Sequence, residues 1–83
     1  MIEGRQVWAA RALLGWSREA LSQASQVSVS VIGRLENGEA DCRASTWRRV
    51  LSTLRGQGIE FMNGEDGSIG VRLRRLSPQE PAK

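Results

Sequence analysis

The chain lacks histidine altogether and has a single cysteine, Cys42, among its 83 residues. Without histidine, it lacks the commonest metal ligand and the side chain best suited to transfer protons near neutral pH. One thiol cannot form an internal disulfide or a zinc site made of several thiolates. The sequence also has no glycine-rich phosphate loop after a strand. We therefore expect no enzyme activity, no cofactor, no metal and no small-molecule ligand.

Long hydrophobic runs are missing as well. No apolar stretch approaches the length that crosses a bilayer, and the first residues lack the apolar core of a signal peptide. A lone cysteine among polar residues is typical of the reducing cytoplasm. These features predict a cytoplasmic protein that makes no contact with a membrane.

Basic residues outnumber acidic ones by 12 to 9, which gives a net charge of +3 and a pI of about 10.4. This balance favours anionic partners, although +3 by itself also fits an ordinary soluble protein. A chain of this length forms one domain near the lower size limit for independent folding. Contact with a second subunit would add to such a small core.

Apolar residues recur with helical spacing over the first two thirds of the chain. Gly15 ends the first helix, and Ser17 and Ser28 are typical N-cap residues for the next two. Asn37 and Gly38 end the third helix, and Ser45 or Thr46 can cap the fourth. The predicted helices are 5–14, 18–24, 29–36 and 46–55.

The second and third helices are separated only by a short turn, so their apolar residues can share one core. This spacing predicts a helix-turn-helix over residues 17–38, in which the second of the two helices enters a DNA groove. The apolar positions are Ala20, Leu21, Ala24, Val27, Ile32 and Leu35.

Two charged residues of opposite sign lie within these apolar stripes. Arg11 is four residues after Val7, and Glu36 is four residues after Ile32. A charge on a buried stripe must reach water or meet an opposite charge. We predict an ion pair between Arg11 and Glu36 that joins the first helix to the end of the third.

After Gly58 the apolar residues alternate, which predicts a β-hairpin with strands 59–62 and 69–74. Placing Glu60 opposite Arg72 brings the apolar residues onto one face. A lone hairpin is marginally stable, so this face must pack on the helices or pair with a second copy. The predicted domain spans residues 1–76, and the polar tail 77–83 is expected to be disordered. The candidates for a dimer contact are Ile59, Phe61, Ile69, Val71 and Leu73.

Three strings, ARALLGWS (10–17), LSQASQVS (21–28) and VIGRLENG (31–38), resemble the phage-repressor (Cro-type) helix-turn-helix family over residues 6–38. ALLGWS followed by GIEF is similar to a compact bacterial group of transcriptional regulators and extends the resemblance to residue 61. The resemblance implies a mainly α, four-helix repressor-like fold, with the C-terminal β-hairpin following it. It also implies operator DNA as partner, a homodimer, and an Arg–Glu bridge at Arg11 and Glu36.

The resemblance further assigns individual roles on the DNA face. It places Val29, Ser30 and Arg34 at base-reading positions, with Val31 and Gly33 alongside. It places Ser17, Arg18, Asn37 and Arg43 at phosphate-contacting positions. The sequence departs from the family at two positions, since Gln26 replaces the turn glycine and Arg18 replaces a frequent glutamine.

The chemistry of the third helix supports the same assignment. Ser28 lies at its N-terminus, where backbone N–H groups and the helix dipole attract phosphate. Arg34 is its only long polar side chain that faces outward, which makes a contact with guanine the best match. Val29 and Val31 can touch thymine methyl groups or sugars. Such a small reading surface predicts modest specificity.

Two functions therefore compete. The first is a sequence-specific transcriptional regulator of the bacterial cytoplasm, associated with the nucleoid when bound and acting as a homodimer. The second is a protein-interaction module of the same fold, such as an antitoxin or adaptor, whose hairpin surface and exposed Trp8 bind a partner protein. Basic residues flanking the third helix favour the first.

Overall fold

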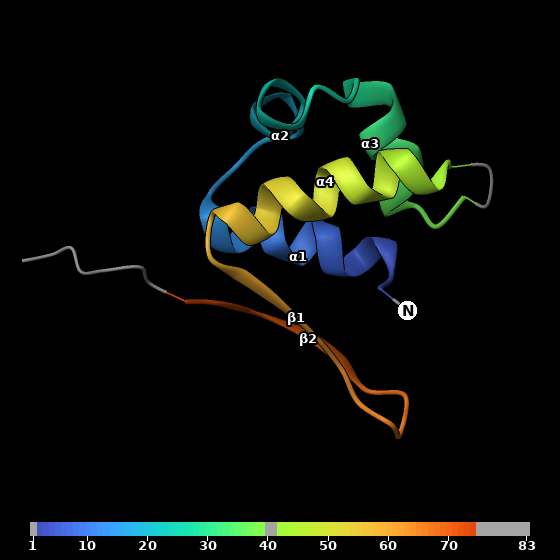
Figure 1. Ribbon diagram of the computed structural model, residues 1–83, viewed down its shortest axis with the longest axis vertical. Helices are drawn as coiled ribbons and strands as arrows, with labels where there is room; N and C mark the ends of the chain where they lie inside the picture. The colour runs from blue at the N-terminus through green and yellow to red at the C-terminus, as the bar shows by residue number, and fades with distance from the viewer. Residues whose placement is uncertain (1, 40–41, 75–83) are drawn as a thin grey trace, which may run out of the picture.

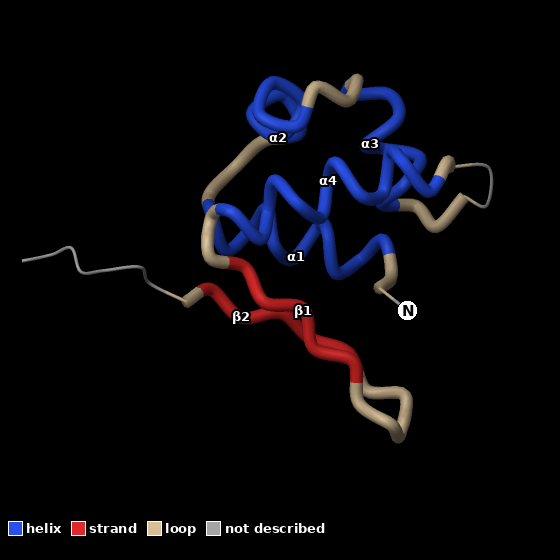
Figure 2. Tube along the Cα trace, in the orientation of Figure 1, coloured by secondary structure: helices blue, strands red, loops and turns tan. Residues whose placement is uncertain are grey.

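A computed structural model describes residues 2–39 and 42–74, and the predicted tail 77–83 lies outside this part of the chain. The described part is mainly helical and ends in a two-stranded hairpin (Figures 1 and 2). The elements are α1 (Gly4–Leu14), α2 (Arg18–Ser25), α3 (Val29–Glu36), α4 (Ala44–Gly56), β1 (Ile59–Asn63) and β2 (Ile69–Leu73).

The core is formed by residues of all four helices together with Ile59, and the hairpin runs beneath α1 with β1 also contacting α4 (Figure 1). Each helix contributes the apolar residues that its period predicts, and burying them supplies most of the driving force for folding. The fully buried hydrophobic residues are Val7, Ala10, Leu21, Ile32, Leu35, Val50 and Leu54.

The helix-turn-helix is closed by local hydrogen bonds at both helix starts. The Ser17 hydroxyl accepts a bond from Ala20 N–H at 3.0 Å, and the Ser28 hydroxyl accepts one from Val31 N–H at 3.2 Å. Between the helices, Gln26 adopts a left-handed conformation with φ of 63°. The non-glycine residue in the turn therefore takes the positive φ that the family's glycine takes without strain.

The boundary of α4 differs from its prediction. The helix begins at Ala44, two residues early, and Arg43 rather than Ser45 or Thr46 is its N-cap. Trp47 N–H already donates to the Arg43 carbonyl at 3.1 Å, which closes the first turn before either hydroxyl residue can act as cap. The predicted bounds of α3 are confirmed, and α1, α2, β1 and β2 each differ from their predictions by one residue at one end.

The hairpin has the predicted register, with Glu60 opposite Arg72 and Phe61 opposite Val71. Arg72 Nε donates to Glu60 Oε1 at 2.8 Å on the outer face. This hydrogen bond lowers the pKa of the Glu60 carboxyl below its ordinary value. Both charges are therefore accommodated on the face that points away from the helices.

The apolar face of the hairpin packs on the protein's own helices. Ile59 is 2% exposed, and Phe61, Val71 and Leu73 pack against the same core. Within one chain they pack on α1 and α4, and their role as dimer contacts stays a prediction. Ile69 is half-buried at the start of β2. Of the two alternatives for this face, the structure has the intramolecular one.

Candidate nucleic-acid interface

The outer face of α3 is open along its whole length. Ser30, Arg34 and Asn37 lie on successive turns of this face, and all three are exposed. Val29 and Val31 are half-buried at its two edges, and Val31 also packs against the core. The helix therefore presents two short polar side chains and one long basic one between apolar edges.

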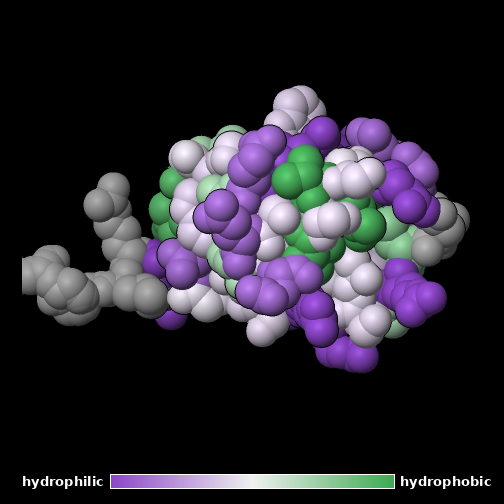
Figure 3. All heavy atoms as spheres, turned by 90° about the horizontal axis from the view of Figure 1, so that it is seen from above, coloured by the Kyte–Doolittle hydropathy of each residue, from purple (hydrophilic) through white to green (hydrophobic). Residues whose placement is uncertain are grey.

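Figure 3 looks onto the end of the molecule that α2 and α3 form. A small hydrophobic area there is bordered by hydrophilic residues. This surface is mixed, with neither a broad apolar patch nor a deep polar pocket in view.

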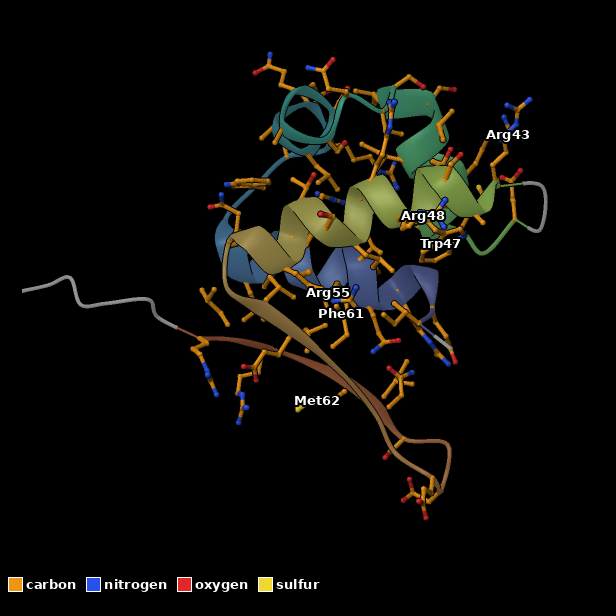
Figure 4. The ribbon with its side chains drawn as sticks, viewed as in Figure 1. Arg43, Trp47, Arg48, Arg55, Phe61 and Met62 are labelled. Atoms are coloured by element: carbon orange, nitrogen blue, oxygen red, sulfur yellow. The ribbon has the colours of Figure 1, made fainter. Side chains whose placement is uncertain are left out.

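Arg43 lies beside one edge of α3. A groove of about 230 Å³ separates α3 from the start of α4, and Val31, Arg34 and Arg43 are among the residues that line it. Figure 4 shows the Arg43 side chain pointing outward at this end of α4, away from the hairpin. The predicted phosphate-contacting arginine thus lies on the same side of the molecule as Arg34.

Arg18 lies beside the other edge of α3. A Cβ atom built on Gly33 would lie 3.3 Å from Arg18 Nη1, so the guanidinium passes directly over this glycine. Gly33 is buried beneath Arg18, and its predicted contact with the DNA backbone stays a prediction. Because Gly33 has no side chain, Arg18 can lie close to the backbone of α3.

The ion pair predicted between Arg11 and Glu36 is present. Arg11 Nε and Nη2 donate to the two carboxylate oxygens at 2.6 and 3.0 Å, and Nη1 donates to the Trp16 carbonyl at 3.0 Å. The Glu36 side chain is 2% exposed. The hydrogen bond that Arg11 donates to Glu36 raises the pKa of Arg11 above its ordinary value.

The same carboxylate also accepts a bond from a second arginine that the sequence did not predict. Arg18 Nε lies 3.0 Å from Glu36 Oε1, and the Arg18 side chain is 41% exposed. Arg11 holds Glu36 from the core side while Arg18 holds it from the surface side. The end of α3 is thereby fixed to both α1 and α2.

Arg34 pairs with an acidic neighbour in the absence of DNA. Arg34 Nε lies 3.5 Å from Glu39 Oε1, and both side chains are nearly half exposed. A pair of this kind in water contributes little stability and is easily exchanged for another partner. It leaves Arg34 on the outer face of α3.

Sequence reasoning missed three residues that hold the elements together, two of them near this surface and one at the hairpin. Gly4 is buried where α1 meets α3, and a Cβ there would lie 2.2 Å from the Leu35 carbonyl oxygen. Arg49 Nη1 donates to the carbonyl of Gln26 in the turn at 3.4 Å. Gln6 is buried and bonds the hairpin. Gly4 alone carried a signal, as a glycine in a helical stretch with no turn to require it.

Within residues 2–39 and 42–74, no group of three or more acidic or cysteine side chains is arranged to hold a metal ion. None of the described helices is long and apolar enough to span a membrane.

Capped helices joined by a tight turn, with an exposed second helix between two arginines, define a DNA-binding helix-turn-helix domain. The comparison with known families agrees, since the helix-turn-helix family model matches residues 9–58. The chain belongs to this family, which is found in Cro- and phage-repressor-like regulators. No curated protein matches the chain.

Proposed function

We propose that the protein is a sequence-specific transcriptional regulator that binds double-stranded DNA as a homodimer, with α3 in the major groove. The observation that carries this proposal is the open outer face of α3, flanked by Arg18 from α2 and by Arg43 before α4. A helix with basic side chains on both edges fits between two phosphate backbones.

Each exposed side chain then has a distinct role. Arg34 donates to guanine, because a guanidinium matches the two acceptors of that base in the major groove. Ser30 contacts a neighbouring base edge, and Val29 contacts a thymine methyl group or a sugar. The residues assigned to phosphates and sugars are Ser17, Arg18, Ser28, Val31, Asn37 and Arg43.

This function places the protein in the bacterial cytoplasm, associated with the nucleoid when bound. A regulator with one arginine for base readout discriminates modestly, so DNA shape and bridging water contribute to its preference.

Selection of binding sites from a randomised DNA library tests the function. The wild-type protein is expected to enrich a short motif that contains a guanine in each half-site. Arg34→Ala is expected to lose roughly 1–3 kcal/mol of binding free energy and its preference at that base pair. Arg48→Ala is the matched control, because Arg48 is an exposed arginine of α4 outside this face. Enrichment of no motif, or the same preference in both variants, contradicts the proposal.

The second function, a protein-interaction module such as an antitoxin or adaptor, is supported by exposed apolar side chains on α1 and β1. Trp8, Leu13 and Met62 are 62%, 46% and 42% exposed. If the folded protein enriches no DNA motif, these side chains become the first positions to substitute in a search for a protein partner.

A further inference from the structure

The carboxylate of Glu36 lies between two arginines that differ in their surroundings. Arg11 is 12% exposed and makes two bonds to Glu36 from α1. Arg18 is 41% exposed and reaches the same carboxylate only through Nε. The Arg18 guanidinium therefore extends from a buried anchor to the surface of the molecule.

Arg11, Glu36 and Arg18 together carry one more positive than negative charge, and Glu19 is a further acid that acts electrostatically on Arg11. The Arg18 side chain is the most exposed of the three, so its guanidinium is the cationic group that an external anion can reach. A buried carboxylate with one bidentate arginine needs no second one for stability. The positive charge of Arg18 is therefore available to bind an anion outside the protein.

Gly33 determines where this charge lies. Its missing side chain lets the Arg18 guanidinium cross α3, with Nη1 at 3.3 Å and Cζ at 3.6 Å from where a Cβ would stand. The path from α2 over Gly33 to Glu36 brings the guanidinium to the edge of the outer face of α3. Ser30 and Arg34 occupy the adjacent exposed positions on that face.

We infer that Arg18 is positioned for DNA binding by the missing side chain of Gly33 and by its bond to Glu36, so that its guanidinium is oriented toward a backbone phosphate beside α3. This inference rests on the proposed DNA-binding function. An arginine side chain loses considerable rotamer freedom when it binds. Glu36 already restricts the rotamers of Arg18 before DNA binds. The loss of rotamer freedom therefore does not reduce the affinity for DNA.

The substitution Gly33→Ala separates this role from a purely structural one. Alanine favours a helix interior over glycine, and the atom nearest the new Cβ is the movable end of the Arg18 side chain. The thermal midpoint of the variant is therefore expected to be unchanged or higher. Its affinity for a mixed-sequence DNA duplex is expected to fall roughly threefold or more, because Arg18 is displaced.

A double-mutant cycle identifies Arg18 as the cause. In an Arg18→Ala background, adding Gly33→Ala is expected to have no further effect on affinity. Arg18→Ala alone is expected to reduce the slope of log affinity against log salt by about one unit, as for one lost phosphate contact. Arg18→Lys keeps the positive charge, but a lysine ammonium lacks the planar guanidinium that can donate to Glu36 and to a phosphate at the same time. This variant is therefore expected to keep the salt slope of binding and to bind DNA more weakly.

The outcomes distinguish this inference from the proposed function. If the wild-type protein binds the duplex and the effects of Gly33→Ala and Arg18→Ala simply add, the positioning of Arg18 over Gly33 is rejected and DNA binding stands. An unchanged salt slope in Arg18→Ala likewise rejects it. If the folded wild-type protein binds no DNA at any salt concentration, both proposals are rejected.

Discussion

At the scale of single residues, the buried pair of Arg11 and Glu36 carries the largest energetic consequence. Glu36 is almost completely removed from water, and Arg11 supplies two of its hydrogen bonds. Removing one partner of a buried pair costs more than the pair contributes, because the other charge remains buried. The stability of the domain therefore depends on keeping both residues or neither.

Arg11→Met is expected to lower the free energy of unfolding by roughly 3 kcal/mol, near the lower end for a stranded buried charge, since Arg18 still contacts Glu36. Urea unfolding followed by tryptophan fluorescence measures the change. The control is Arg5→Met, whose pair with Glu3 is well exposed and is expected to cost less than about 1 kcal/mol. Equal losses in the two variants would show that the buried pair has no special role.

Gln26 shows how one residue departs from its family without altering the fold. Its φ of 63° places a side chain in a region that costs a non-glycine residue roughly 1 kcal/mol. Its carbonyl accepts a hydrogen bond from Arg49, and its N–H donates to the Ser22 carbonyl at 2.9 Å. The turn geometry is set by the two helices that it joins, so the residue adapts to it.

At the scale of elements, the hairpin is attached to α1 by one buried polar side chain. Gln6 Nε2 donates to the Gly70 carbonyl at 2.9 Å and to the Met62 carbonyl at 3.3 Å, while Oε1 accepts from Glu3 N–H at 2.8 Å. The side chain thus closes the start of α1 and joins it to both strands. A second contact joins the hairpin to α4, where Arg55 Cζ lies 5.5 Å from the centroid of the Phe61 ring.

Gln6→Leu is expected to lower the free energy of unfolding by roughly 1–3 kcal/mol, because it leaves partly buried carbonyl groups of the hairpin without their donor. Amide hydrogen exchange is expected to rise in β1 and β2 and to stay unchanged in α2 and α3. Gln57→Leu, at an exposed position after α4, serves as the control. Faster exchange across all four helices instead would mean that the hairpin and the helices unfold as one unit.

At the scale of the whole molecule, the hairpin completes the monomer's core. Its apolar face covers the helices, and its outer face presents Glu60 with Arg72 and Arg74. Trp8, Leu13 and Met62 are the large apolar side chains that remain exposed among the described residues, and they are further candidates for a homodimer contact.

If the protein binds operators as a homodimer, the selected DNA sites are expected to contain two inverted half-sites about 10 base pairs apart, one helical turn. Sedimentation equilibrium is expected to show two protein chains on each site. Adding about 5 base pairs between the half-sites turns them to opposite sides of the DNA and is expected to abolish joint binding. A single half-site occupied by one chain would instead identify a monomeric DNA-binding protein.

The sequence by itself determined the helices, the caps at Ser17 and Ser28, the register of the hairpin and the pairing of Arg11 with Glu36. Each of these depends on local periodicity or on a charge within an apolar stripe, which a single chain displays directly. The outward position of Arg34 followed for the same reason.

Only the tertiary structure decided which contacts join one helix or strand to another. It assigned the apolar face of the hairpin to the protein's own helices, gave Gln6 its partners in both strands, and placed Arg18 over Gly33 onto Glu36. These contacts join residues that are distant in the chain or that carry no periodic signal. Their geometry depends on how closely two backbones approach, and that distance is fixed only when the whole core packs.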